Sequence, residues 1–578
     1  MNNVIDFWPT LKRLLYYGTN VKKYLILGFT LLLFSSIFEV LNPILISCFI
    51  KHYFINNTVN YSLKIITYYL ILQILAAILN YHQNIIFNKI SLTVIQKLRY
   101  DVMSSTLQLP IKMFDQRPIG QFISRITNDT ETIKELYDTV IKSLFQNIIL
   151  ILITLITMFI LEWRMACIAS IIFPIALIIM LLYQYFSKPI LRKIKVYIAN
   201  IYNIFNEIIN GIDVIQQFHQ EQKFRKSIKK ISISHYYFRM KILKLDSFLL
   251  RPLLNFCSTL ILCGLILIFG IYPIGFFEIG TLYAFITYLN RLNEPLITIT
   301  SQQSIFQQAI VAGERIFEII HTPKQQYGDD SLHFREGNIK VKNLYFSYTN
   351  NNVYVLKNIN IFIPSKQFIA FVGRTGSGKS TLSKLLIGHY PATLGKICLD
   401  ERNIQTFTHN VLKKNISIVQ QDPIILNDTI LENITLGRNI STKKVLKILK
   451  TIKLIQFVNS LPKGLKTLLG ENGNILSIGQ KQLLSIARTL ISCPKILILD
   501  EATSNVDLDT ENNIKKILSS VKHLTTIIAI THRLSTIKHA DNIFVFNNGE
   551  IVESGTHYNL IRKKSYYKNM YYSQAIKN

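Results

Sequence analysis

Six long hydrophobic stretches occupy the N-terminal half of the chain, at 24–50, 65–87, 137–161, 165–186, 248–271 and 279–300. Each approaches or exceeds the roughly 20 apolar residues that an α-helix needs to cross a bilayer. The pattern therefore predicts six transmembrane helices. The connections after the second and fourth stretches are long and keep a helical apolar periodicity, so we expect these helices to continue beyond the membrane.

Basic residues gather in the two long connections, and in the first of them they are Lys89, Lys97, Arg99, Lys112, Arg117, Arg125 and Lys134. The positive-inside rule then places both long connections and both termini in the cytoplasm. The first apolar run begins near Tyr24, exceeds the core of a signal peptide in length and is followed by further runs. We therefore expect no cleavable signal peptide, and a multi-pass protein of the cytoplasmic (inner) membrane.

The C-terminal half changes to alternating strand and helix patterns. The polar stretch at 321–337 is typical of a linker, and we expect an α/β domain over 338–578. The apolar run 367–372 predicts a buried strand, which a glycine-rich loop and a helical pattern follow. The loop fits the GxxxxGK[ST] pattern of a P-loop in its required strand, loop and helix context. It consists of Gly373, Arg374, Thr375, Gly376, Ser377, Gly378, Lys379, Ser380 and Thr381.

This loop has the chemistry to bind a nucleoside triphosphate. Its glycines let backbone N–H groups face phosphate oxygens, Lys379 brings a charge to the β- and γ-phosphates, and Ser380 offers a hydroxyl to Mg²⁺. A second apolar strand, at 496–499, ends in Asp500 and Glu501. The first carboxylate can organise Mg²⁺ through water, and the second can orient or deprotonate an attacking water. Such a pair alone is commonly just a solvated strand end, but beside a P-loop it favours hydrolysis.

The composition supports a membrane protein. Hydrophobic residues make up 49% and charged residues 17%, which excludes a disordered chain and is unusual for a soluble one. The formal net charge of +30 raises the question of nucleic acid, but no nucleic-acid-binding motif accompanies it. Loops against anionic lipid, a solvated basic face or an AT-rich genome also explain the charge. We expect no nucleic-acid partner, and we expect the six cysteines to be structural because their spacing fits neither a zinc site nor a disulfide framework.

A few ionisable residues lie inside the predicted spans, where they are functional candidates by default. Glu39 is the leading candidate for a substrate contact. A structural role also explains each of these residues. Arg251 can lie at a helix end and extend its charged group to the membrane surface, and Arg291 can neutralise Glu294 three residues further along the same helix face.

Further motifs resemble those of the ATP-binding cassette (ABC) family. Leu476-Ser-Ile-Gly-Gln480 is similar to the LSGGQ signature, and Gln421 in VQQDP resembles the Q-loop glutamine. The stretch 504–507 resembles the D-loop, and His532 in AITHRLST resembles the switch histidine. Tyr348 matches the aromatic residue that stacks on adenine. The motifs occur in the order that the family has.

The resemblance implies ATP and Mg²⁺ as cofactors and a role for each matching residue. The implied catalytic residues are Glu501, His532 and Gln421. The implied metal ligands are Ser380, Gln421 and, through water, Asp500. Tyr348 and the P-loop are implied to bind the nucleotide. The residues implied to contact an ATP molecule on a second chain are Ser477, Gly479 and Gln480.

The membrane half resembles that of bacterial ABC exporters, in which each half-transporter carries one membrane domain and one ATPase domain. The stretches 109–129 and 207–221 are similar to the two intracellular loops that carry coupling helices. The implied fold is a six-helix transmembrane domain over 1–320, followed by the linker and the α/β P-loop nucleotide-binding domain. The implied function is ATP-driven export of amphipathic small molecules, drug-like compounds or lipids. A nucleotide-gated channel or regulator, or an accessory half that supports a partner, remains an alternative.

Ile478 departs from the family pattern, which has glycine at the corresponding position. A β-branched side chain restricts the backbone and the approach of a phosphate. In the family, this position faces the ATP molecule on the partner's P-loop. The departure suggests two unequal sites and a heterodimer with a related half, although a homodimer stays open.

Overall fold

The computed structural model describes the chain except for residues 1–6, 20, 56–58, 272–278, 350–352, 503–505, 532–536, 564–565 and 576–578. The chain forms two compact units. Unit 1 contains residues 1–108 and 118–322, and unit 2 contains residues 109–117 and 323–578. The short segment Leu109–Arg117 therefore packs with the second unit, although the chain on both of its sides belongs to the first.

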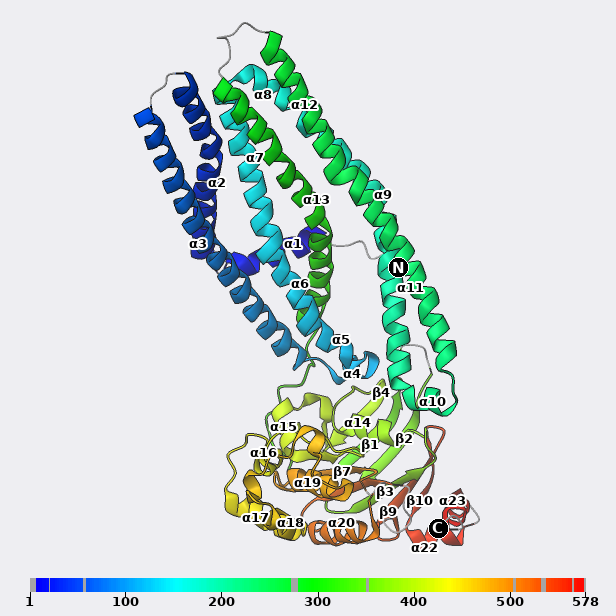
Figure 1. Cartoon of the computed structure of the whole chain (residues 1–578). Helices are drawn as coiled ribbons and strands as arrows, with labels where there is room; N and C mark the ends of the chain where they lie inside the picture. Colours follow the sequence, from blue (N-terminus) through cyan, green and yellow to red (C-terminus); the bar gives the residue numbers. More distant parts are fainter. Residues whose placement is uncertain are drawn as a thin grey trace. The chain divides into compact units, whose positions relative to one another are not determined.

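Unit 1 is helical throughout its described residues (Figure 1). Its longest helices continue far beyond the apolar stretches, as the periodicity predicted. Short π-helical turns at Lys51–Ile55, Arg125–Asp129, Leu136–Ile141 and Asp246–Leu250 adjoin the α-helices. The α-helices are α1 (Phe7–Thr19), α2 (Lys22–Ile50), α3 (Val59–Thr106), α5 (Ile119–Ser124), α6 (Thr130–Glu135), α7 (Lys142–Leu161), α8 (Trp163–Ala169), α9 (Ile172–Asn210), α10 (Ile212–Gln217), α11 (Glu221–Leu245), α12 (Arg251–Ile271) and α13 (Ile279–His321).

Five helical stretches of the described chain are long and apolar enough to cross a membrane: Lys22–Tyr53, Tyr61–Thr106, Ile119–Leu161, Trp163–Asn210 and Glu221–Ile268. The sixth predicted span, 279–300, lies in the continuous helix α13 but is not among the five. Its polar run Asn290-Arg-Leu-Asn-Glu294 lowers the apolar character of the helix. A sixth crossing therefore stays a prediction.

Polar side chains inside unit 1 bond between helices. Asn80 of α3 donates to the Glu39 carboxylate over 3.2 Å, and Arg291 donates to the backbone carbonyl of Glu39 over 2.6 Å. Glu294 pairs with Arg251 at 3.3 Å. The predicted pairing of Arg291 with Glu294 within one helix face is therefore wrong, because partners on neighbouring helices take both side chains.

Unit 2 contains two sheets. An antiparallel sheet has the order β2-β1-β4-β5, and a larger sheet has the order β10-β9-β3-β8-β7-β6. In the larger sheet, β3, β6, β7, β8 and β9 are parallel, and β10 pairs antiparallel to β9. The strands are β1 (Ile339–Phe346), β2 (Leu356–Ile363), β3 (Phe368–Gly373), β4 (Leu394–Leu399), β5 (Arg402–Asn403), β6 (Ile416–Val419), β7 (Ile496–Asp500), β8 (Thr526–Ile530), β9 (Asn542–Asn547) and β10 (Glu550–Gly555).

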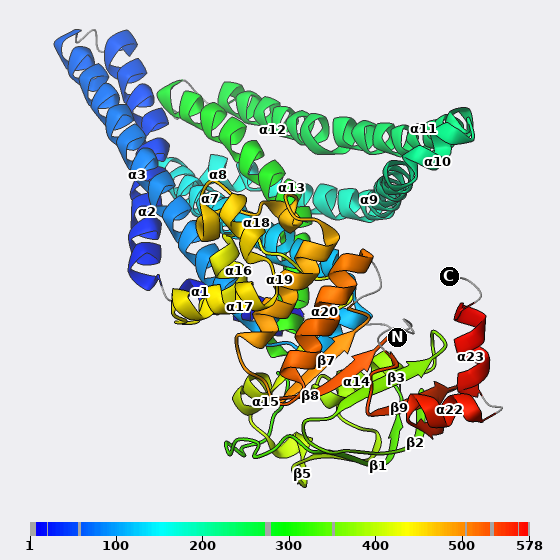
Figure 2. The ribbon, with the colours of Figure 1, turned by 90° about the horizontal axis from the view of Figure 1, so that it is seen from below.

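Short helices cover the larger sheet. Figure 2 shows α22 and α23 near β2 and β9, away from α17 and α18. The helices are α4 (Ile111–Gln116), α14 (Lys379–Leu386), α15 (His409–Asn415), α16 (Ile430–Thr435), α17 (Thr442–Thr451), α18 (Ile455–Ser460), α19 (Ile478–Leu490), α20 (Leu508–Val521), α22 (His557–Arg562) and α23 (Tyr566–Ala575), with 3₁₀ turns at Ile404–Thr406, Gly464–Lys466 and Glu471–Gly473.

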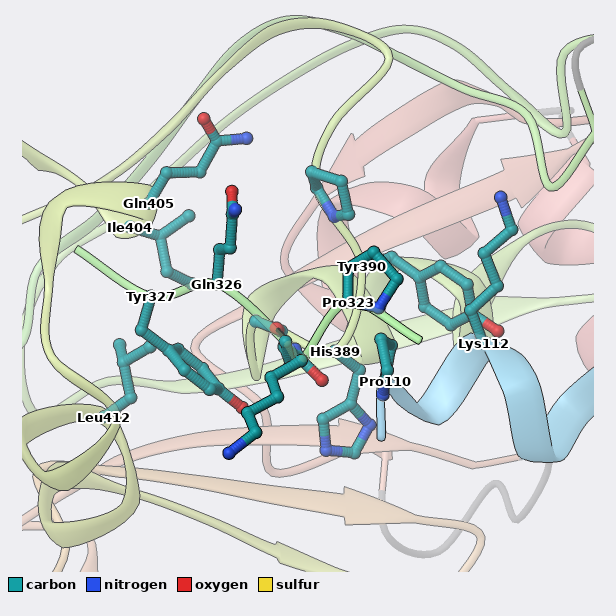
Figure 3. Close-up of a pocket in the computed structure, with 14 residues that line it drawn as sticks. Pro110, Lys112, Pro323, Gln326, Tyr327, His389, Tyr390, Ile404, Gln405 and Leu412 are labelled. Atoms are coloured by element: carbon teal, nitrogen blue, oxygen red, sulfur yellow. Dashed lines mark hydrogen bonds between the residues drawn. The ribbon is translucent and has the colours of Figure 1, made fainter. Parts of the chain in front are cut away.

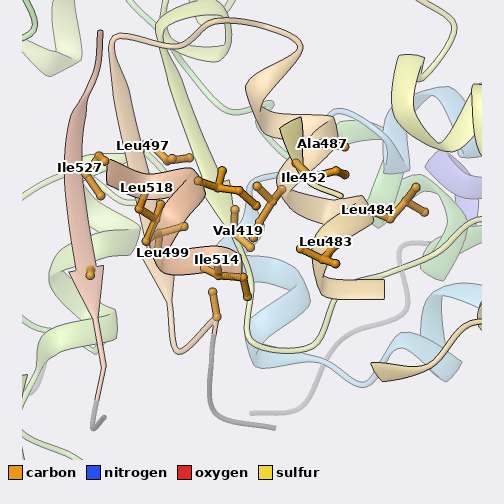
Figure 4. Close-up of a cluster of buried hydrophobic side chains, with 14 of the residues drawn as sticks. Val419, Ile452, Leu483, Leu484, Ala487, Leu497, Leu499, Ile514, Leu518 and Ile527 are labelled. Atoms are coloured by element: carbon orange, nitrogen blue, oxygen red, sulfur yellow. The ribbon is translucent and has the colours of Figure 1, made fainter. Parts of the chain in front are cut away.

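A hydrophobic core lies between the sheet and α19 and α20. Leu497, Leu499 and Ile527 of the strands pack with Leu484 of α19 and Ile514 of α20 (Figure 4). Every residue of β3 is buried, because both faces of this parallel strand are covered. The carboxyl ends of β3 and β7 point to the same edge of the sheet, and this brings the predicted P-loop and the predicted acidic pair together.

Candidate nucleotide site

The P-loop leaves β3 and enters α14 through glycine conformations. Gly376 and Gly378 have positive φ angles of 82° and 101°. A Cβ atom at Gly378 would lie 2.6 Å from the Leu356 side chain, and one at Gly373 would lie 2.3 Å from the Phe546 carbonyl oxygen. Glycine is therefore required for both backbone angle and space.

Lys379 begins α14 and turns its side chain back over the loop. Its ammonium group donates to the carbonyl oxygens of Gly373 and Arg374 over 2.7 and 2.8 Å, and to Ser377 Oγ over 3.3 Å. Burial lowers the pKa of Lys379, and the carboxylates of Glu501 and Asp500 oppose this effect. The cation is thus held in the middle of the loop, close to the predicted acidic pair.

Ser380 and Asp500 meet across the sheet edge. Ser380 Oγ donates to Asp500 Oδ1 over 3.2 Å. Burial raises the pKa of Asp500 because it disfavours the charged carboxylate. A cation beside Asp500 would stabilise that charged form. No group of three or more His, Cys, Asp or Glu in the described chain could hold a metal ion. One hydroxyl beside one carboxylate nevertheless fits Mg²⁺, which usually takes few protein ligands and completes its shell with phosphate and water.

The signature stretch forms the N-terminus of α19. Ser477 caps the helix: its hydroxyl accepts from the Gln480 N–H over 3.2 Å, and the Ser477 N–H donates to the Gln480 side chain over 2.9 Å. Gly479 is buried, and a Cβ there would lie 2.9 Å from Thr510 Oγ1 of α20. Ile478 is 59% exposed, so its side chain leaves this packing undisturbed.

The Q-loop follows β6 and touches the signature helix. Gln482 of α19 is buried and donates to the backbone carbonyl of Gln420 over 3.2 Å. Gln421, the next residue, is exposed. Sequence reasoning missed Gln482, which ties the Q-loop to α19. His532 and residues 504–505 of the predicted D-loop stretch 504–507 lie outside the described residues.

Tyr348 lies beside the P-loop. Its hydroxyl donates to Thr381 Oγ1 over 3.1 Å, and its ring packs edge-on against Phe346 and Tyr390 at centroid distances of 4.8 and 5.3 Å. The predicted adenine-stacking residue is thus fixed next to the end of the loop, half-buried among aromatic rings.

The helix α4 contacts the same region through Asp115. The Asp115 carboxylate accepts from Tyr390 OH over 2.6 Å and pairs with Lys384 of α14 at 2.9 Å. Burial alone would raise the pKa of Asp115, but the hydrogen bonds from Tyr390 and Lys384 hold it below its ordinary value. No sequence motif predicts this cluster, which joins α4 both to the helix that starts at Lys379 and to the ring beside Tyr348.

A cavity of about 620 Å³ lies between α4, residues 323–327 and the segment after α14. Figure 3 shows Pro110 and Lys112 of the α4 segment near Tyr327, His389 and Tyr390. No P-loop residue lines this cavity, so it is separate from the loop that holds Lys379.

A helical unit with long apolar helices, followed by a P-loop sheet with a signature helix, defines the ABC transporter class. Two family models match the chain: the ABC transporter transmembrane region over residues 25–296, and the ABC transporter over residues 356–504. The chain belongs to the ABC transporter family. It is a multi-pass membrane protein with an ABC ATPase domain that binds ATP, as the sequence predicted.

Among curated relatives, the multidrug resistance-like ATP-binding protein MdlB of Buchnera aphidicola subsp. Acyrthosiphon pisum is 56% identical over the full length of both chains. The putative ABC transporter ATP-binding protein exp8 of Streptococcus pneumoniae is 35% identical and covers 100% of this chain and 99% of its own. The chain is thus an exporter-type, MdlB-like half-transporter, and this architecture implies dimerisation with another half.

The solved structure of a bacterial Atm1-family ABC exporter with ATP bound shares the fold. The TM-score is 0.80 at 22% identity, with 96% of this chain and 98% of that chain covered. The predicted fold class, a helical ABC membrane domain followed by an ABC nucleotide-binding domain, is confirmed.

Proposed function

We propose that the chain is one half of an ATP-driven exporter that moves amphipathic small molecules, drug-like compounds or lipids, across the cytoplasmic membrane by alternating access. The observation that carries the proposal is the hydrogen bond of Ser380 to Asp500, which joins the P-loop to the acidic pair in one chain with membrane helices. The relative MdlB is described as multidrug resistance-like, which supports this substrate class.

In this proposal Lys379 exchanges its backbone carbonyl partners for phosphate oxygens. Ser380 and Gln421 would hold Mg²⁺, with Asp500 acting through water, and bound Mg²⁺ would supply neutralisation of the phosphate charge. Glu501 orients the attacking water or accepts its proton, and His532 contacts the γ-phosphate. Tyr348 stacks on the adenine, and its hydrogen bond to Thr381 at the end of the loop supports this role.

The second half-transporter completes the site. Ser477, Gly479 and Gln480 contact the ATP on the partner's P-loop, so two ATP molecules favour the closed pair of domains. ATP can shift this equilibrium only by its preference for the closed state, and a nearly complete shift needs roughly 10⁴-fold preference. The membrane domain over 1–320 would then open to the other side, with both termini and the ATPase domain over 338–578 in the cytoplasm.

The test is ATP hydrolysis and transport by the purified chain in lipid, alone and with a co-expressed related half. Inverted vesicles should accumulate an amphipathic dye only with hydrolysable ATP. Accumulation that Glu501→Gln in both halves abolishes supports the pump. Nucleotide-dependent flux without accumulation against a gradient would replace the pump by a nucleotide-gated channel. Hydrolysis only in the presence of the partner would assign this chain to an obligate pair.

A further inference from the structure

A second cavity, of about 530 Å³, opens on the surface of unit 1, where α1, α3 and α13 meet. Helix α1 is fixed there by close packing: Leu14 is buried, Tyr137 donates a hydrogen bond to its carbonyl, and a Cβ at Gly313 of α13 would lie 3.0 Å from Thr10. The cavity is therefore a defined hollow between three packed helices and takes no part in the nucleotide site.

The cavity is strongly cationic. Lys12 and Arg13 of α1 and Lys97 of α3 line it, and within the described parts of the chain none of the three forms an ion pair. Its one carboxylate, Asp101, accepts a hydrogen bond from Tyr17 OH over 2.9 Å. His321 also lines it and bonds through Nδ1 to the Phe317 carbonyl over 2.7 Å. Three cations thus face one carboxylate, which leaves an excess of positive charge.

Nearby acids are engaged elsewhere. Glu318, which directly follows Phe317 in α13, pairs with Arg125 at 2.9 Å, and Glu131 pairs with Arg99 at 2.9 Å. Aromatic rings hold two of the cavity's cations instead: Arg13 lies 5.8 Å above Phe317, and Lys97 lies 6.0 Å above Tyr17. These contacts position the cations without neutralising them.

The ends of the apolar runs indicate that the cavity lies near the lipid headgroups. Lys89 donates to Tyr24 OH over 3.1 Å at the residue where the apolar run of α2 begins. Lys97 follows eight residues later on the same helix, or about 12 Å along its axis. Trp8 and Tyr16 of α1 are 75% and 69% exposed. Exposed aromatic and basic side chains on a short amphipathic helix are typical of a helix that lies in the membrane interface.

We propose that this cavity binds the phosphate headgroup of an anionic phospholipid, with Lys12, Arg13 and Lys97 as its ligands. Phosphate esters accept charge-assisted hydrogen bonds from arginine and lysine, which suits three cations without ion pairs. The lipid would then fasten α1 to α3 and α13 at the membrane surface. The proposal rests on the membrane location of unit 1 and not on ATP hydrolysis.

The test measures which lipid the purified full chain retains. Native mass spectrometry of the protein from mixed phosphatidylcholine and phosphatidylglycerol micelles should show preferential retention of phosphatidylglycerol. Arg13→Gln with Lys97→Gln should weaken that retention roughly 30-fold, since each of the two basic residues adds about 1 kcal/mol near an anionic surface. The matched control is Lys22→Gln with Lys23→Gln, which removes the same charge from exposed positions outside the cavity.

Equal retention of the two lipids by the unaltered protein would overturn the proposal without any variant. An equal loss in both double variants would also overturn it, because general surface charge would then explain the preference. Displacement of the lipid by inorganic phosphate at low concentration would assign the cavity to free phosphate. Retention needs no nucleotide, so failure here would leave the proposed pump untouched, and loss of ATPase activity would leave this result standing.

Discussion

Glu501 has a backbone conformation that is unusual for a residue other than glycine. It follows β7 directly with φ of 48°, and its N–H donates to the Ile530 carbonyl over 2.8 Å. Non-glycine residues in this region are strained unless their surroundings hold them, and such residues gather at functional sites. The backbone thus aims this side chain, and the strand pattern of 496–499 could not predict that angle.

Glu501→Gln should keep ATP binding and lower hydrolysis by about 100-fold or more, since general-base catalysis contributes about 10²–10⁴-fold. The amide keeps the shape of the side chain but cannot accept a proton. Steady-state phosphate release should be measured in a dimer whose other site is also disabled. Normal turnover there would remove Glu501 as the catalytic carboxylate.

Lys379→Ala should weaken ATP binding itself by roughly 10–100-fold, the effect of losing a charge-assisted hydrogen bond. Equilibrium titration with a fluorescent ATP analogue measures this change. Lys396→Ala, which removes an exposed lysine from β4, is the matched control. Equal affinities of the two variants would contradict the role given to Lys379.

Ile478→Gly should leave nucleotide binding at this chain's own P-loop unchanged. The side chain is 59% exposed, and the cap formed by Ser477 and Gln480 does not involve it. Glycine at an exposed helix position costs at most about 1 kcal/mol of stability. The same nucleotide titration, made on the chain alone, checks this expectation, and a large shift in affinity would end the argument that Ile478 acts on the partner's ATP.

At the scale of elements, strand and helix patterns predicted much of the ATPase unit. The run 367–372 and the loop after it became β3, the P-loop and α14, because a buried strand and a phosphate loop have strong local signals. Pairings between distant elements had no such signal. Asp115 and Lys384 are 269 residues apart, and Glu294 bonds to Arg251 on another helix instead of to its neighbour Arg291.

We expect the contact of Asp115 in α4 with Lys384 to affect the coupling of ATP hydrolysis to transport more than the stability of the fold. The Asp115–Lys384 pair is more than a third exposed on both sides, and such pairs contribute little to folding. Hydrogen bonding lowers the pKa of Asp115. The contribution of the Asp115 carboxylate to folding stability is therefore present above the ordinary carboxyl pKa, and it is lost as the pH falls through the lowered pKa. The contact is therefore fully formed at neutral pH.

Asp115→Ala should reduce transport per ATP hydrolysed by about fivefold or more, with basal hydrolysis nearly unchanged, since a coupling of about 1 kcal/mol corresponds to such a factor. Transport and phosphate release are measured in the same vesicles. Lys112→Ala, an exposed change on the same helix, is the control. An unchanged ratio in Asp115→Ala would exclude Asp115 from coupling.

At the scale of the whole molecule, the half-transporter has to supply two different surfaces to its partner. In the proposed function, its P-loop and acidic pair hold one ATP, and its Ser477–Gln480 stretch faces another. In a heterodimer whose other half has glycine at the signature position, the site built on this chain's P-loop meets that glycine. The site built on the partner's P-loop meets Ile478, whose branched side chain restricts the approach of a phosphate. The two sites should therefore hydrolyse ATP unequally.

Lys379→Ala in this chain should then abolish most turnover of the heterodimer, whereas the equivalent lysine change in the partner should lower it by about twofold or less, on the expectation that the site facing Ile478 turns over slowly. Phosphate release by each singly altered heterodimer measures the two contributions. Ile478→Gly is the decisive control. It should raise the contribution of the partner's site to total ATP turnover, so that the two lysine variants lose more similar fractions of that turnover. If the two lysine variants lose equal fractions of turnover while Ile478 is still present, Ile478 is compatible with full ATPase activity. A homodimer with two such sites would then hydrolyse ATP.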